Sequence, residues 1–128
     1  MSITNRDVYS SALVHIGSTA QSPFCADYEE RAPYLLANFC SMNRSLDAAI
    51  RKGEELEDAK SFSPAYLSLE ADFPLCEKLI APAIFYIAAM LIIDEDSALS
   101  DDLYDKYCDS ISELSFSVGS VKENYFYN

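Results

Sequence analysis

Glycine and proline are scarce in this sequence, and their scarcity excludes most β-rich folds. The 128 residues include only three glycines and five prolines. A β-sandwich or β-barrel needs a turn roughly every eight to twelve residues, and such turns depend on these two residue types. Half of the residues are hydrophobic, which is enough for a core and is not typical of a disordered chain. At this length a single domain is expected.

Basic residues are also few. Nine Lys and Arg stand against 21 Asp and Glu, which gives a formal net charge of −12. An acidic surface repels nucleic acid and anionic membranes, and duplex DNA is bound by cations that displace its counterions. The charge therefore excludes sequence-specific DNA binding. Two relations to DNA stay open: a protein that mimics DNA, or a wall past which DNA slides without binding.

The residues that usually carry catalysis are sparse or unpatterned. His15, the single histidine, falls beside the apolar face of the first predicted helix, as a boundary histidine would. No GxSxG, HExxH or glycine-rich phosphate loop is present. Paired acids are typical of solvated helix faces. The acidic stretch 94–102 does not match a calcium-binding EF-hand loop, because it lacks the glycine and the final glutamate of that loop. We expect no enzyme, no cofactor and no metal site.

The cysteines do not form a recognisable metal or disulfide pattern. The four lie far apart, without a CxxC pair, and a zinc site would have to gather distant points with one histidine to help. Reduced thiols packed in helices are therefore expected. The first ten residues lack the basic and apolar regions of a signal peptide, so a reducing, cytosolic context is expected. The four residues are Cys25, Cys40, Cys76 and Cys108.

A run of fifteen uncharged residues, 79–93, raises the question of a membrane span. At 1.5 Å per residue it reaches about 22 Å, short of the roughly 30 Å hydrocarbon core. Three acids follow it at 94–96, and no cluster of Lys or Arg flanks it. The run predicts the central apolar helix of a soluble bundle, kinked near Pro82. Short neighbouring helices hardly wrap such a helix, so another copy of the chain is expected to complete its cover.

Hydrophobic periodicity predicts the other helices. Thr4 caps a first helix with Asp7 in a capping box, and Gly17 ends it. A second helix runs from 27 to 53, either kinked at Pro33, which we favour, or restarted there. Ser63 caps a predicted short helix at 64–71, although alternation over 66–69 also fits an extended segment. The stripe of the second helix consists of Tyr28, Ala32, Leu35, Phe39, Met42, Leu46 and Ile50.

The last predicted helix begins after Ser97 or Ser100 and ends near residue 114. Leu103, Tyr107, Ile111 and Leu114 form its apolar row, opposite an acidic face. The rest of the chain has no helical period, so we expect two parts: a helical domain of four to five helices at 1–114 and an extended C-terminal docking tail at 115–128. The apolar side chains of the tail are Phe116, Val118, Val121, Tyr125, Phe126 and Tyr127.

Four stretches together resemble a known family. They are TNRDVYSSALVHIG at 4–17, DYEERAPYLLANF at 27–39, FPLCEKLIAPAIFYIAAMLIIDED at 73–96 and LSDDLYDKYCDSISEL at 99–114. In helix order, length and character they are similar to the head-to-tail adaptor proteins, also called connector or head-completion proteins, of long-tailed bacteriophages. The resemblance covers roughly residues 4–114 and rests on no single diagnostic motif.

The resemblance implies a structural role in the virion neck. Adaptors of this family form a ring, typically of twelve copies, below the portal protein. The ring extends the DNA channel and meets the next head-completion or tail protein. A C-terminal segment commonly docks on the portal, and by position this would be 115–128 in the present chain. DNA would pass without specific binding, no membrane would be involved, and the protein would be made in the host bacterial cytoplasm.

Two other interpretations remain. One is a small acidic helical inhibitor, or DNA mimic, that binds a basic groove on a host protein. The other is a helical adaptor in bacterial regulation. Tyrosine, with nine copies, is enriched at protein interfaces and is compatible with all three.

Overall fold

The chain folds into an all-α bundle, as predicted. The computed structural model describes residues 2–17 and 25–127, with side chains for 2–17 and 26–118. Within those residues there is no β-strand, only an isolated bridge between Thr4 and Asp72. The elements are α1 (Asn5–His15), α2 (Cys25–Met42), α3 (Arg44–Gly53), the 3₁₀ turn η1 (Glu77–Leu79), α4 (Ile80–Leu91) and α5 (Ser97–Tyr127).

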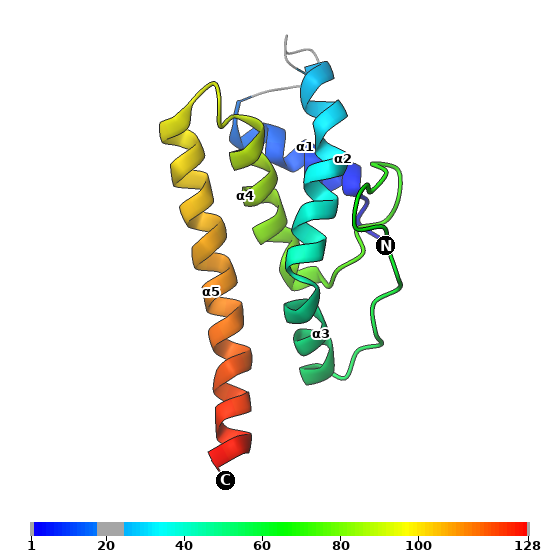
Figure 1. The fold of residues 1–128 in the computed structure, drawn as a ribbon, viewed down its shortest axis with the longest axis vertical. Coiled ribbons are helices and arrows are strands. Elements are labelled where there is room, and N and C mark those ends of the chain that lie inside the picture. The colour runs from blue at the N-terminus through cyan, green and yellow to red at the C-terminus, as the bar shows by residue number, and fades with distance from the viewer. Residues whose placement is uncertain (1, 18–24, 128) are drawn as a thin grey trace.

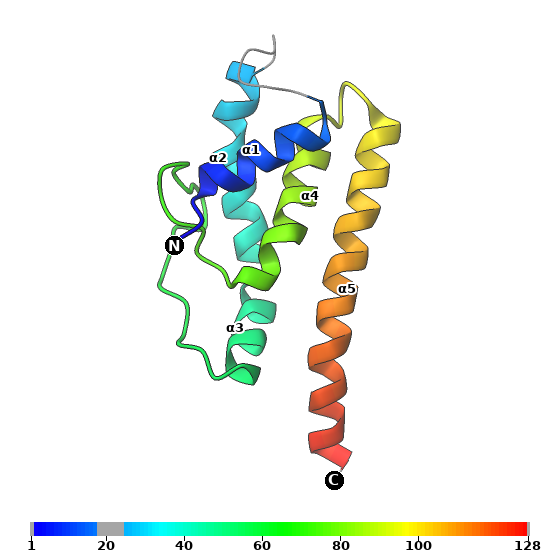
Figure 2. The ribbon, with the colours of Figure 1, turned by 180° about the vertical axis from the view of Figure 1, so that it is seen from behind.

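The helices are arranged around α4. Figure 1 shows α4 between α5 on one side and α2 on the other, with α3 continuing beyond the end of α2. From behind, α1 crosses both α2 and α4 (Figure 2). The long segment between α3 and η1 runs along the edge of α2, on the side away from α5. The predicted central position of the apolar run is confirmed.

Helix α1 begins with the predicted capping box. The Thr4 side chain accepts a hydrogen bond from the Asp7 N–H (3.1 Å), and the Asp7 carboxylate accepts one from the Thr4 N–H (2.9 Å). The N–H groups of Asn5 and Arg6, which have no partner inside the helix, donate to carbonyls of the segment 69–71. Gly17, with φ of +69°, follows the helix end as predicted.

The predicted helix at 27–53 is two helices. Pro33 lies inside α2, as favoured, but the break comes at Asn43, where φ is −108° and ψ is 15°. Hydrogen bonds continue across it, from the Asn43 N–H to the Phe39 carbonyl (3.1 Å) and from the Asp47 N–H to the Asn43 carbonyl (2.9 Å). Met42, predicted on the apolar stripe, is 52% exposed, whereas Asn43 and Asp47 are buried.

The predicted short helix at 64–71 is wrong. No helix is found between Glu54 and Cys76. Burial alternates instead, with Leu67 and Leu69 inside and Tyr66 and Ser68 outside, which matches the extended interpretation. The backbone of this segment also bonds to other elements: the Leu67 N–H, for example, donates to the Pro33 carbonyl of α2 (3.1 Å).

Helix α4 carries most of the apolar run. Pro82 lies in its first turn, where a missing N–H costs nothing, so the expected kink is a junction between η1 and α4. Packing against α1, α2 and α5 buries most of the helix. Ile93, just after it, stays 49% exposed. No helix in the described part of the chain is long and apolar enough to cross a membrane.

Three aromatic rings join α2, α4 and α5 at the centre of the bundle. The Phe39 ring centroid lies 5.8 Å from that of Tyr86 and 5.9 Å from that of Tyr107, and the two tyrosines are 5.2 Å apart. The Asn38 side-chain amide donates to the Tyr86 hydroxyl (2.6 Å). Such pairs add about 0.5–1.5 kcal/mol each beyond their burial, so this cluster holds the long helices in register.

Helix α5 begins at Ser97, one residue before the start that a Ser97 cap predicts and four before the start that a Ser100 cap predicts. The Asp96 carboxylate accepts a hydrogen bond from the Leu99 N–H (3.0 Å), so Asp96 is the capping side chain, while the Ser100 hydroxyl is buried and donates to the Ala89 carbonyl (2.9 Å). The predicted apolar row is confirmed: Leu103 and Tyr107 are buried, and the two residues that follow in the row are half-buried.

The predicted extended tail is helical where its side chains are described, at 115–118. Half-buried Val118 continues the row of Ile111 and Leu114 at helical spacing, so the packing face persists beyond residue 114. Side chains of the remaining tail lie outside the described residues.

Candidate interaction surfaces

The solvent side of α5 is a continuous acidic face, which consists of Asp101, Asp102, Asp105, Asp109 and Glu113. All five side chains are exposed, as predicted. None of them forms an ion pair within the described residues. Lys106 is the one base in this part of α5, and its amine lies 6.0 Å from the Phe85 ring centroid. The face therefore projects a largely uncompensated negative potential.

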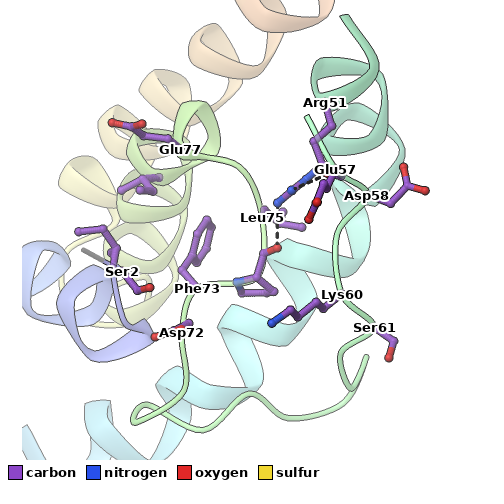
Figure 3. Close-up of a pocket in the computed structure, with 13 residues that line it drawn as sticks. Ser2, Arg51, Glu57, Asp58, Lys60, Ser61, Asp72, Phe73, Leu75 and Glu77 are labelled. Atoms are coloured by element: carbon purple, nitrogen blue, oxygen red, sulfur yellow. Dashed lines mark hydrogen bonds between the residues drawn. The ribbon is translucent and has the colours of Figure 1, made fainter. Parts of the chain in front are cut away.

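Two positive side chains meet four acids at a cleft of about 680 Å³ beside the segment 54–76 (Figure 3). Phe73, Leu75 and Ile80 contribute apolar lining. In Figure 3, Lys60 points from the segment into the cleft, whereas Asp58 points away from it. The charged lining residues are Arg51, Lys60, Glu57, Asp58, Asp72 and Glu77.

Arg51 in this cleft serves the fold. Its Nε donates to the Asp47 carboxylate (2.9 Å), and its two terminal nitrogens donate to the carbonyls of Glu57 (3.0 Å) and Pro74 (3.3 Å). The other oxygen of Asp47, which is 1% exposed, accepts the Cys76 N–H (2.7 Å). This arrangement clamps both ends of the segment 54–76 to α3, so the cleft offers no free guanidinium to a ligand.

The cysteines do not have the environment of a catalytic nucleophile. Burial raises the pKa of the Cys40 thiol to about 12 and, together with a hydrogen bond to Asp47, that of Cys76 to about 11. A reactive cysteine requires the opposite shift, toward the thiolate. Cys108 is exposed on α5, so the prediction of packed thiols is wrong for it, because it flanks the apolar row instead of lying on it. The Cys25 side chain lies outside the described residues.

The remaining predicted site residues do not form a cluster. The His15 ring lies against Phe85, with centroids 5.4 Å apart, at the boundary between core and solvent as predicted. Phe116 is 78% exposed, and Val118 is half-buried. The four other docking residues, Val121, Tyr125, Phe126 and Tyr127, have side chains outside the described residues. Among those described, no group of three His, Cys, Asp or Glu could hold a metal ion.

A second groove, the Tyr66 groove, escaped the sequence analysis. It has a volume of about 290 Å³ and lies between the first half of α2 and the segment 66–70. The Tyr34 ring, 58% exposed, packs edge-on against the Tyr66 ring, 48% exposed, with centroids 5.2 Å apart. The only signal in the sequence was that Tyr34 falls off the apolar stripe of its helix. The charged and apolar residues that line the groove include Arg6, Glu29, Glu30, Pro33, Leu69 and Glu70.

Comparison with protein-family models, with curated proteins and with solved structures gave no match to this chain.

Proposed function

We propose that this chain is a structural subunit of a bacteriophage neck, a head-to-tail adaptor that assembles as a ring below the portal and extends the DNA channel toward the tail. The acidic face of α5 is the observation that carries the proposal. Residues 101–113 carry five exposed carboxylates and only one base, Lys106. None of these carboxylates forms an ion pair within the described residues. A channel wall of this kind repels the DNA backbone and lets the duplex slide.

The rest of the molecule supports a structural role over a catalytic one. The Cys40 and Cys76 thiols have raised pKa values, and the described side chains include no metal-binding cluster. A chain of net charge −12, repeated around a ring, would surround the bore with negative charge. The ring would sit in the virion at the head–tail interface, with the portal on one side and a further head-completion or tail protein on the other.

Assembly with the portal tests the proposal directly. Light scattering of the purified chain, alone and mixed with portal protein of the same genome, should reveal a ring-sized assembly on the portal. The triple variant Asp102→Asn, Asp105→Asn, Asp109→Asn should still assemble, because these acids face solvent, but its rings should retain DNA more strongly. A chain that never associates with portal-containing particles would refute the adaptor function.

The C-terminal segment gives a second test. Truncation after Val118 keeps every described side chain of the core and should leave the Tm unchanged, while the helical circular dichroism falls only by the share of the removed end of α5. If 119–128 docks on the portal, the truncated chain should fail to assemble there. Full assembly by the truncated chain would remove the docking role from the segment.

DNA mimicry is the second candidate, and the spacing of the acidic face favours it. Five carboxylates span twelve helical steps, or about 18 Å, which is one charge per roughly 4.5 Å. One strand of duplex DNA carries a charge per about 3.4 Å of axis. A mimic would form a stoichiometric, salt-sensitive complex with a DNA-binding protein, and the triple Asn variant would lose it. The same variant leaves portal assembly intact, so it separates the two functions.

A further inference from the structure

We propose that the Tyr66 groove is a docking site for a basic segment of a partner protein, whose Arg or Lys side chain inserts beside the Tyr34–Tyr66 ring pair. The site lies on the edge of the bundle formed by α2 and the segment 66–70, apart from the acidic face of α5. It would bind such a segment whichever function the chain serves.

The shape of the groove suits a side chain. Its volume of about 290 Å³ lies at the lower limit of small-molecule pockets, so one or two inserted side chains fill it. Pro33 and Leu69 contribute apolar lining, and the ring of Tyr66 contributes an aromatic surface. Tyrosines in such positions supply contact area at low entropic cost, which is why they are enriched at interfaces.

The charge of the groove selects a cation. Three carboxylates and one guanidinium line it, and the difference is a net charge of −2. Arg6 bridges two of the acids: its Nη1 donates to Glu29 (2.8 Å) and its Nε donates to Glu70 (2.9 Å). Glu30 forms no ion pair with any residue that the structure describes. One positive charge is thus already in place, and the carboxylates have capacity for a second.

Arg6 also fixes the geometry of the site. Because it connects α1, α2 and the segment 66–70, it holds two carboxylates at the rim before any partner arrives. A preorganised site loses less entropy on binding. An arriving guanidinium or ammonium group would meet these carboxylates and, beside them, the Tyr34 and Tyr66 rings, which attract cations through their quadrupoles. An anionic or purely apolar segment would gain neither interaction.

The test uses the full-length ¹⁵N-labelled chain and two capped synthetic peptides, Ala-Arg-Pro-Arg-Ala and its counterpart with Gln in place of both Arg. In NMR titrations the Arg peptide should shift amides of the first half of α2 and of 66–70, and the Gln peptide should not. Tyr66→Ala should weaken binding about fivefold and Glu30→Gln about threefold. Tyr66→Phe, which keeps the ring, should bind as the unsubstituted chain does.

The acidic face of α5 supplies matched controls. It offers more carboxylates than the groove and one exposed tyrosine, Tyr104, and none of its residues lines the Tyr66 groove. Tyr104→Ala and Asp105→Asn should leave peptide binding unchanged. Shifts spread equally over α5, or equal losses from Tyr66→Ala and Tyr104→Ala, would show general attraction to an acidic protein and overturn the proposal. Concentration-dependent shifts at the groove without peptide would assign it to a second copy and also overturn it.

Discussion

Among single residues, Asp47 joins α3 to the backbone that leads into η1. It is the one buried carboxylate among the described residues, and it faces both Arg51 of its own helix and the backbone just before η1. A buried charge is tolerated only when its hydrogen bonds are complete, because burial without them costs several kcal/mol. The stability of the α3 end of the bundle therefore depends on this one side chain.

Replacing Asp47 should destabilise the protein far more than replacing Asp27. Asp47→Ala removes the acceptor of the Arg51 Nε–H and of the Cys76 N–H and leaves the buried side of the guanidinium without a counter-charge, and we expect a loss of about 3–5 kcal/mol in the free energy of unfolding. Asp27 pairs with Arg31 at the same i,i+4 spacing but is 60% exposed, so Asp27→Ala should cost less than about 1 kcal/mol. Urea unfolding of both variants at neutral pH measures the difference. Equal losses would show that Asp47 does not clamp the segment 54–76 to α3.

The raised pKa values of the buried thiols predict that the free energy of unfolding falls at alkaline pH. Unfolded, a cysteine loses its proton near its ordinary pKa of 9.0, whereas folded Cys40 holds it until the pH reaches about 12. Between about pH 9 and 12 the unfolded state binds fewer protons, so the free energy of unfolding falls as pH rises. We expect Cys40 to contribute a fall of about 1 kcal/mol between about pH 8 and pH 10 under reducing conditions. Cys40→Ala should show a shallower pH dependence; an unchanged slope would mean that the Cys40 thiol is not the cause.

At the scale of elements, the end of α4 is finished by a side chain from α2. The Arg31 guanidinium donates to the carbonyls of Met90 (2.9 Å) and Leu91 (3.3 Å), which are among the last four of α4 and have no partner within the helix. A cation at a helix C-terminus also complements the helix dipole. One residue thus ties α2 to the turn that leads into α5.

Arg31→Ala should therefore cost more than removal of its ion-pair partner. We expect about 1.5–3 kcal/mol for the lost charged hydrogen bonds, compared with the small effect of Asp27→Ala. Amide hydrogen exchange should accelerate at 92–96 in the Arg31 variant and stay unchanged in the Asp27 variant. If both variants exchange alike, the guanidinium does not cap α4.

How far the sequence predicts these elements depends on where their partners lie. Thr4, Gly17 and the acidic face of α5 follow local rules of capping and periodicity, and the structure confirms them. The break at Asn43 does not follow such local rules. The Asn43 side-chain amide is buried and donates to the Phe39 carbonyl and to the Tyr107 hydroxyl, and only tertiary packing brings Tyr107 next to it. The Tyr66 groove was missed for the same reason: its two walls are more than thirty residues apart in the sequence, and no local pattern brings them together.

For the whole molecule, the net charge of −12 acts against the folded state. Folding brings the acidic side chains closer together, so their repulsion destabilises the compact state. Salt screens this repulsion, because the Debye length falls from about 30 Å at 0.01 M to about 10 Å at 0.1 M ionic strength. We expect Tm to rise by about 3–8 °C between about 10 mM and 300 mM NaCl. The triple variant Asp102→Asn, Asp105→Asn, Asp109→Asn should show a smaller rise. A Tm that falls with salt would mean that ion pairs such as Arg6–Glu29 outweigh the repulsion.

The start of α1 also constrains the order in which the chain acquires its structure. The Asn5 and Arg6 amides donate to the Ala71 and Leu69 carbonyls, and the Asn5 side-chain amide donates to the Ser68 carbonyl (2.9 Å). Closing so long a loop carries an entropic cost, and contacts between distant residues slow folding. On the ribosome, the first helix of the protein would therefore wait, incompletely bonded at its N-terminus, until the chain beyond residue 71 had left the exit tunnel.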